Sequence, residues 1–138
     1  LEGGTVQLFV QENSFNVPAT RLSDGTLRYL SLLAILYDPN PPPFVCIDEP
    51  ELGLHPDLIG QLADALRYAS QRTQLVVTTH SDALVDHFTE EPEVILVCEK
   101  TDGCTQIRRL DAEHMRPWLE KYRLGALWIS GEIGGNRW

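Results

Sequence analysis

The sequence predicts an α/β fold in which a mostly parallel sheet is flanked by helices and a β-hairpin lies near each end of the chain. Three observations support this prediction. Strand-like and helix-like segments alternate through the middle of the chain, a pattern typical of right-handed α/β units. The short apolar run 44–47 ends abruptly in two acidic residues, as a central strand buried on both faces does. With 138 residues, 43% hydrophobic and 22% charged, the chain has the size and composition of one globular domain.

The elements before the acidic pair are a hairpin and a helix. Val6, Leu8 and Val10 share one face of an extended segment, and residues 15–17 resume the alternation after a turn at residues 12–13. The almost continuous apolar pattern of residues 24–37 predicts a helix buried on most of its surface. A proline-rich segment, residues 38–43, ends it because proline cannot continue a helix.

The elements after the acidic pair alternate between helix and strand. Residues 56–71 carry one apolar stripe and predict an amphipathic helix. A strand (75–78), a short helix (82–88), a strand (94–98), its antiparallel partner (105–110) and a last helix with Pro117 in its first turn follow, before an irregular tail from residue 124.

Composition and charge restrict the function classes. The net charge of −9, with 20 acidic against 11 basic residues, argues against a broad phosphate-tracking surface, so nucleic acid would be contacted only through other regions. It does not exclude nucleotide binding, in which backbone N–H groups and a metal ion neutralise phosphates. No apolar run is long enough to span a membrane, and no signal peptide opens the chain. Cys46 and Cys98 lie in apolar runs without metal-ligand spacing, which predicts buried thiols and fits a reducing cytoplasm.

The first candidate site is the segment Leu22-Ser23-Asp24-Gly25-Thr26, directly before the predicted buried helix. A hydroxyl, free backbone N–H groups and the positive end of a helix dipole together form an anion site. The alternative is a plain helix N-cap, since Ser and Asp cap helices generally. The segment alone favours the N-cap.

The second and third candidates follow predicted strands. Asp48 and Glu49 point in different directions on an extended chain, so one can hold a hydrated Mg²⁺ and the other can orient a water as general base. A solvated acidic turn is the alternative. In Thr78-Thr79-His80-Ser81, His80 can donate to a phosphate oxygen while Ser81 caps the next helix. The alternative is a structural histidine.

Together, in order and spacing, these segments resemble the C-terminal half of an ABC-type ATPase head, in the branch that includes the RecF-, SMC- and OLD-like predicted AAA-type ATPases. Residues 22–26 resemble the signature motif, with Asp24 and Thr26 as departures from its usual Gly and Gln. Residues 44–51 resemble the Walker B strand, residues 52–56 the D-loop, and residues 78–81 the switch histidine. The resemblance implies a partial P-loop NTPase lobe.

The resemblance also implies a role for each matching residue. Asp48 would hold Mg²⁺ through water, Glu49 would polarise the attacking water, and His80 would contact the γ-phosphate of ATP. The signature segment (Ser23, Asp24, Gly25 and Thr26) would contact ATP bound to a partner head, with Ser23 and Gly25 on its γ-phosphate. The D-loop residues Gly53, Leu54 and His55 would lie across the seam of a head-to-head homodimer that sandwiches ATP.

The chain also departs from that family pattern by lacking a motif. No G-x-x-x-x-G-K-[ST] occurs, so the phosphate-cradling Walker A loop is missing and the chain alone should bind ATP poorly. The chain opens on Leu1 and its only methionine is Met115, so we expect residues 1–138 to be a single incomplete domain that works with its own Walker A-containing N-terminal lobe. The alternative is a non-catalytic interaction or oligomerisation module with the same fold. A nuclease of the OLD type would require an appended acidic metal-binding domain.

Overall fold

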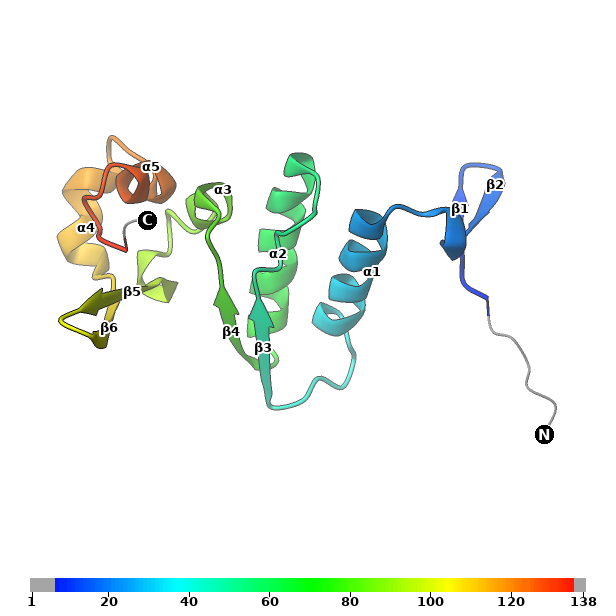
Figure 1. Ribbon diagram of the computed structural model, residues 1–138, viewed down its shortest axis with the longest axis horizontal. Helices are drawn as coiled ribbons and strands as arrows, with labels where there is room; N and C mark the ends of the chain where they lie inside the picture. Colours follow the sequence, from blue (N-terminus) through cyan, green and yellow to red (C-terminus); the bar gives the residue numbers. More distant parts are fainter. Residues whose placement is uncertain (1–6, 136–138) are drawn as a thin grey trace.

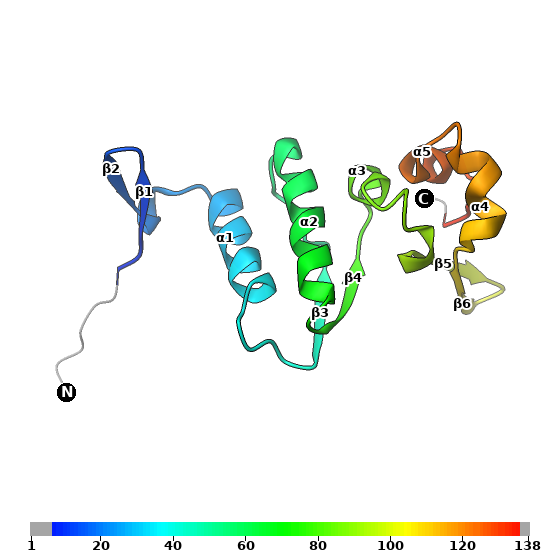
Figure 2. The same cartoon turned by 180° about the vertical axis from the view of Figure 1, so that it is seen from behind.

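The computed structural model describes residues 7–135, which form an elongated molecule (Figure 1). A hairpin stands at the N-terminal end, two helices and two strands follow in the middle, and a second hairpin with three helices forms the C-terminal end. Figure 2 shows the same linear order from behind. Within the described chain the strands form three separate two-stranded sheets, so parallel pairing is confined to one pair and is less extensive than the expected mostly parallel sheet.

The predicted N-terminal hairpin is present. Strand β1 (Phe9–Glu12) pairs antiparallel with β2 (Phe15–Pro18), with Glu12 opposite Phe15. The turn is therefore one residue later than expected and begins at Asn13, which has the left-handed φ of 52° that asparagine tolerates. Val6 lies outside the described residues. Phe9 and Phe15 are exposed because the hairpin stands apart from the helix that follows (Figures 1 and 2).

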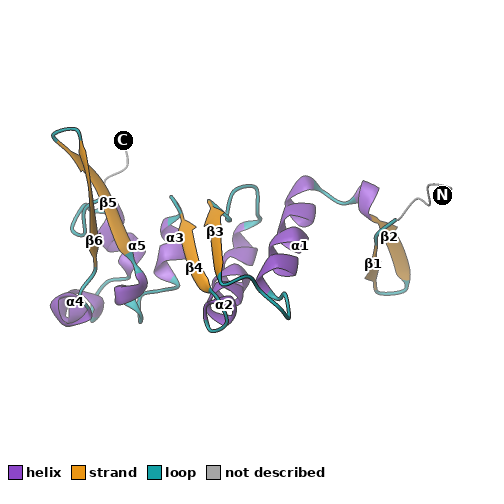
Figure 3. Ribbon diagram, turned by 90° about the horizontal axis from the view of Figure 1, so that it is seen from below, coloured by secondary structure: helices purple, strands orange, loops and turns teal. Residues whose placement is uncertain are grey.

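The central unit is one β-α-β crossover with an additional helix. Helix α1 (Asp24–Leu36) leads to β3 (Phe44–Asp48), and helix α2 (Ile59–Ser70), preceded by a 3-10 turn (Pro56–Leu58), connects β3 to the parallel strand β4 (Gln74–Thr78). The strands are paired in register from Phe44 opposite Gln74 to Asp48 opposite Thr78. Helix α2 covers one face of this pair, and α1 lies beside α2 (Figures 1 and 3).

The first core forms between these helices and the covered face of the sheet. Its buried side chains come from one stripe of α2, from the end of α1 and from one residue of the next helix: Leu32, Leu36, Ile59, Leu62, Ala63, Ala65, Leu66, Ala69 and Leu84. The predicted amphipathic stripe of α2 is therefore confirmed. The Tyr29 hydroxyl of α1 donates a hydrogen bond to Gln61 Oε1 of α2 (3.1 Å). The pKa of Tyr29 is raised, first by burial, which disfavours the phenolate, and second by the charge of Tyr37.

Two burial predictions for this unit were wrong. Strand β3 is not buried on both faces, because its residues alternate between exposed and half-buried, and Phe44 is 53% exposed. Helix α1 is not buried on most of its surface, since Leu32 and Leu36 are its buried residues. Both segments are more apolar than their surroundings require because no other part of residues 7–135 covers their outer faces. Cys46 is exposed for the same reason, and Cys98 is exposed too, contrary to expectation.

The C-terminal unit begins with helix α3 (Asp82–Asp86) and contains the second predicted hairpin, β5 (Leu96–Thr101) and β6 (Cys104–Arg109). Helix α4 (Ala112–Leu119) is capped by Asp111, so Pro117 lies at its sixth residue and not in its first turn. The tail is not wholly irregular, because Leu124–Ile129 form helix α5. These elements enclose a second core: Val85, Val97, Leu110, Met115, Leu124, Leu127 and Ile133. Within residues 7–135, no helix is both long and apolar enough to cross a lipid bilayer.

Candidate functional site

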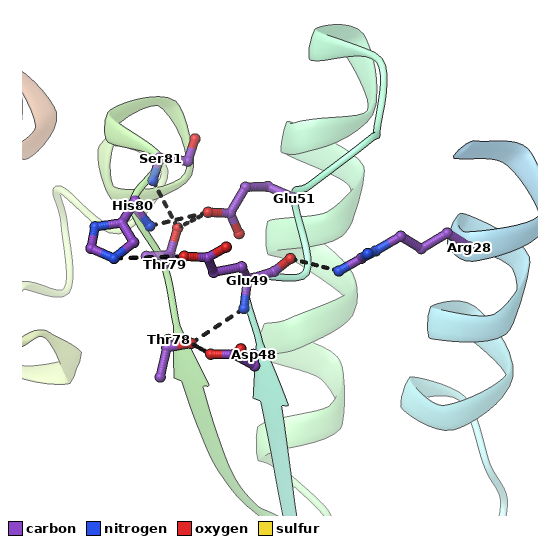
Figure 4. Close-up of polar contacts among 8 residues, drawn as sticks. All are labelled: Arg28, Asp48, Glu49, Glu51, Thr78, Thr79, His80 and Ser81. Carbon is purple, nitrogen blue, oxygen red and sulfur yellow. Dashed lines mark hydrogen bonds and ion pairs between the residues drawn. The ribbon is translucent and has the colours of Figure 1, made fainter. Parts of the chain in front are cut away.

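The ends of β3 and β4 bring two of the three candidate segments together. Because Asp48 pairs with Thr78, the residues that follow them leave the sheet at the same edge. The Thr78 hydroxyl donates a hydrogen bond to Asp48 Oδ1, and the Glu49 N–H donates to the Thr78 carbonyl (3.1 Å) and approaches its hydroxyl (3.2 Å) (Figure 4). The Asp48 carboxylate is thus oriented by a neighbouring strand and remains exposed.

Glu49 has an unusual backbone that turns the chain out of the sheet. Its φ of 42° lies in the left-handed region, which is uncommon for residues other than glycine. Two donors hold its carbonyl in this conformation, Arg28 Nη2 of α1 at 2.9 Å and the N–H of Leu52 at 3.2 Å. The side chain points to His80, with 3.6 Å between Glu49 Oε1 and His80 Nε2 (Figure 4). The carboxylate is 29% exposed and the imidazole 72%, so both are accessible to a reactant.

A third carboxylate, Glu51, connects the loop after β3 to the loop after β4. Its Oε1 accepts hydrogen bonds from the Thr79 hydroxyl (2.5 Å) and from the His80 N–H (3.1 Å). The Thr79 oxygen in turn accepts from the Ser81 N–H (3.0 Å). Ser81 Oγ caps α3 by accepting from the Leu84 N–H (3.1 Å), so the predicted capping role of Ser81 is confirmed. Sequence reasoning included Thr78 in a candidate segment without giving it a role, and it assigned no role to Glu51 or Arg28. An acidic residue so close to Asp48-Glu49 was a usable signal for Glu51.

The Ser23 segment has the geometry of a helix N-cap. Ser23 Oγ accepts a hydrogen bond from the Thr26 N–H (3.1 Å) and lies 2.8 Å from the Thr26 hydroxyl, while Asp24 occupies the first turn, where its charge complements the helix dipole. Gly25 packs against Gly53, because a Cβ added at Gly25 would come within 2.4 Å of the Gly53 carbonyl oxygen. The segment therefore lies against the loop after β3, and the hydrogen bonds of the Ser23 side chain are made within the segment.

The Gly53–His55 loop makes a tight turn between β3 and α2. Gly53 has a positive φ of 76°, and the Leu54 N–H donates to the Glu51 carbonyl (3.1 Å). His55 Nδ1 accepts from the Asp57 N–H (3.3 Å) and caps the 3-10 turn that starts α2. Its imidazole is 70% exposed. His55 therefore has a structural role in the loop, and its ring also faces solvent.

The arrangement suits positioning and charge neutralisation around a hydrated magnesium ion. Residues 7–135 contain no cluster of three or more His, Cys, Asp or Glu side chains that would hold a metal alone. A Mg²⁺ site does not need such a cluster, because Mg²⁺ is usually held by one or two carboxylates together with water and substrate phosphates. Asp48, oriented by the Thr78 hydroxyl, fits that donor set, and Glu49 with His80 offers a base and a hydrogen-bond donor beside it.

Comparison with known proteins places this site in a family. The model of the family described as "AAA domain, putative AbiEii toxin, Type IV TA system" matches residues 3–86, more than half of the chain. The chain belongs to this AAA domain family. The matched region includes Asp48, Glu49 and His80 and ends at the last residue of α3.

Solved structures extend the likeness beyond the region matched by the AAA family. One solved structure is described with the words "Structural biochemistry of ATP-driven dimerization and DNA stimulated activation of SMC ATPases". It matches with a TM-score of 0.61 and 20% identity, over 86% of this chain and 73% of that one. An SMC head bound to the C-winged helix domain of ScpA matches with a TM-score of 0.60 and 21% identity, over 75% of this chain and 31% of that one. Comparison with curated proteins gives no match. The fold is that of a partial P-loop NTPase lobe of the SMC-head type, as the sequence predicted.

Proposed function

We propose that the chain is the C-terminal lobe of an ABC/SMC-like ATPase head that binds and hydrolyses ATP. The observation that carries this proposal is the pairing of Glu49 with His80 across 3.6 Å, beside the exposed Asp48, at the ends of two parallel strands. Open α/β sheets bind their ligands at this edge. Membership in an AAA domain family and likeness to SMC heads support the same reaction.

Each residue at the strand ends has a distinct role in this proposal. Asp48 holds Mg²⁺ through water, and the ion would supply charge neutralisation on the phosphates. Glu49 polarises the attacking water as general base, a task that fits a carboxylate partly shielded from solvent and held by a fixed backbone. His80 contacts the γ-phosphate and helps to position that water. The reaction therefore depends on placement and electrostatics rather than on a covalent intermediate.

The proposed site is completed by a second head. Ser23, Asp24, Gly25 and Thr26 lie at the N-terminus of α1, where a helix dipole and backbone N–H groups favour phosphate oxygens, and would contact ATP held by the partner. The D-loop residues Gly53, Leu54 and His55 would lie across the seam. Because Gly25 packs against Gly53, the signature segment and the D-loop lie side by side and could contact a partner head together. The words "ATP-driven dimerization", with which one similar SMC structure is described, support a homodimer that sandwiches ATP.

The Walker A loop is proposed to come from an N-terminal lobe of the same protein, because residues 1–138 contain no G-x-x-x-x-G-K-[ST]. The 138-residue chain alone is then inactive. Calorimetric titration with Mg-ATP tests this: we expect no binding tighter than about 1 mM, and a Kd of about 1 μM would overturn the proposal. We further propose that the protein acts in the cytoplasm and contacts nucleic acid, if at all, through other regions.

Charge-removing substitutions test the catalytic assignment in the full-length protein. Asp48→Asn and Glu49→Gln should each abolish ATP turnover, since removal of a general base or of the metal-holding carboxylate costs about 10²–10⁴-fold. Glu90→Gln is the matched control, because Glu90 is exposed and lies after α3. Steady-state phosphate release measures the rate. Retained hydrolysis by either variant would contradict the assigned roles.

A non-catalytic interaction module is the second candidate function. It is favoured by the open face of the β3–β4 sheet, where Phe44 is 53% and Val76 is 41% exposed. Exposed apolar patches of this kind mark contact surfaces for other chains. An oligomer of this chain that forms without nucleotide, seen by light scattering, together with unchanged function of the full-length protein after Glu49→Gln, would favour this candidate over the ATPase.

A further inference from the structure

Glu51 joins the His80 loop (residues 79–81) to the loop after β3. One carboxylate oxygen, Oε1, accepts from two consecutive residues of the His80 loop, the Thr79 hydroxyl at 2.5 Å and the His80 N–H at 3.1 Å (Figure 4). Hydrogen bonds to a carboxylate are stronger than those between neutral groups. Because the Ser81 N–H donates to the same Thr79 oxygen, one acceptor orders three residues in succession.

The position of the His80 ring follows the position of its backbone. The imidazole is 72% exposed, so packing contributes little to holding it against Glu49. A shift of the His80 N–H away from Glu51 would move the ring away from Glu49 Oε1. Displacements of about 1 Å at groups that position a reactant cost about 100-fold in rate.

The burial of Glu51 carries a cost at its second carboxylate oxygen. Glu51 Oε2 is buried and accepts no hydrogen bond from any residue of the described chain. A buried acceptor without a donor is destabilising, and such groups in folded proteins call for a specific explanation. The two hydrogen bonds that Oε1 accepts from Thr79 and His80 provide that explanation, because they fix the His80 loop in place.

We propose that Glu51 is a positioning residue that acts through His80: it holds the loop 79–81 so that the imidazole faces Glu49 and the γ-phosphate. This inference rests on the proposed ATPase function. Glu51 itself touches neither the reacting water nor the phosphate. Its substitution should therefore lower kcat while leaving KM for ATP nearly unchanged.

The experiment compares Glu51→Ala, Glu51→Gln, His80→Ala and the double variant Glu51→Ala/His80→Ala in the full-length protein, with Glu90→Gln as control. We expect Glu51→Ala to lower kcat about 100-fold, with KM changed less than about threefold. Glu51→Gln keeps an oxygen acceptor without the charge and should lose about 10-fold. The double variant should match His80→Ala, because a positioning residue has no effect once its target is gone.

Two kinetic results overturn the proposal. One is a wild-type kcat in Glu51→Ala; the other is losses that multiply in the double variant, which indicate a role independent of His80. Amide hydrogen exchange of the 138-residue chain separates this proposal from the function beneath it. Glu51→Gln, and Glu51→Ala if it folds, should exchange the His80 amide about 10-fold faster, while Glu90→Gln should not. Faster exchange in the 138-residue chain, together with a full-length wild-type protein that hydrolyses no ATP, sinks the proposed function and supports the placement of His80 by Glu51. Unchanged exchange sinks the placement itself.

Discussion

Gly25 is the residue at which the first turn of α1 approaches the loop after β3. A Cβ at this position would lie 2.4 Å from the carbonyl oxygen of Gly53, a distance that real Cβ contacts do not reach. The obstacle is backbone, which cannot rotate away as a side chain does. Glycine is therefore required at position 25 by close approach, although the helix alone would favour alanine.

We predict that Gly25→Ala destabilises the chain by about 1–3 kcal/mol, because the loop around Gly53 or the start of α1 must shift to admit the methyl group. The free energy of unfolding, from urea denaturation of the 138-residue chain, measures the effect. Gly60→Ala in α2 is the control: its Cβ would meet the exposed His87 ring at 3.1 Å, and that ring can move. The control should gain up to about 1 kcal/mol of helix propensity. Equal stabilities of the two variants would contradict the contact.

At the scale of elements, Arg72 joins the end of α1 to the end of α2. Its guanidinium donates to the Leu36 carbonyl (2.7 Å) and the Asp38 carbonyl (2.6 Å), which lie at the C-terminal end of α1, and it stacks 4.5 Å from the ring of Tyr68. The last carbonyls of a helix have no partner within the helix, and a cation there also complements the dipole. Arg72 thus replaces a cap that the proline-rich segment does not provide.

Arg72→Ala should destabilise the chain by about 2 kcal/mol or more, because two charge-assisted hydrogen bonds and the stacking contact disappear together. Arg72→Lys should recover less than half of that loss, since an ammonium group lacks the planar fork that reaches both carbonyls. Arg116→Ala, at an exposed position of α4, should stay within about 0.5 kcal/mol of the parent. Thermal and urea unfolding provide the comparison. An Arg72→Ala variant as stable as the parent would show that the contacts of Arg72 do not contribute to stability.

Most elements of the fold were predictable from local pattern, and burial was not. The stripe of α2, the hairpin turn at Asp102-Gly103 and the Ser81 cap follow from periodicity and turn chemistry, which act over a few residues. The exposure of Phe44 and Cys46 does not, because it depends on which other elements pack over the strand, and no other part of residues 7–135 covers them. Local pattern also misplaced Pro117, since Asp111 caps α4 earlier than the proline suggested.

The candidate site was predictable in part for a related reason. Asp48 and His80 each follow an apolar strand, so sheet topology brings them to one edge. The bonds of Arg28 to the Glu49 carbonyl and of Glu51 to the His80 N–H join residues that are 21 and 29 positions apart. No local pattern encodes such contacts. They depend on how α1 and the two loops pack.

At the scale of the whole molecule, two cores meet at α3. Leu84 belongs to the first core and Val85 to the second, so adjacent residues of one short helix face opposite ways. Helix α5 packs closely on α3 at Gly125, whose N–H donates to Asp86 Oδ1 (2.6 Å). The Leu124 N–H donates to the buried Thr89 hydroxyl (3.2 Å). The second core is therefore attached to the first through α3, directly after the His80 loop.

We predict that Gly125→Ala loosens the second core without unfolding the first. A Cβ at Gly125 would meet the Asp82 carbonyl oxygen at 2.4 Å and Asp86 Oδ1 at 2.6 Å, so α5 must move away from α3. Amide exchange should rise about tenfold or more in β5, α4 and α5, while amides of α2 and β4 change by less than about threefold. Ala126→Ser, at the exposed neighbouring position, is the control and should alter neither region. Equal acceleration in both cores would show instead that the chain unfolds as one cooperative unit, in which the lobe that carries His80 has no stability of its own.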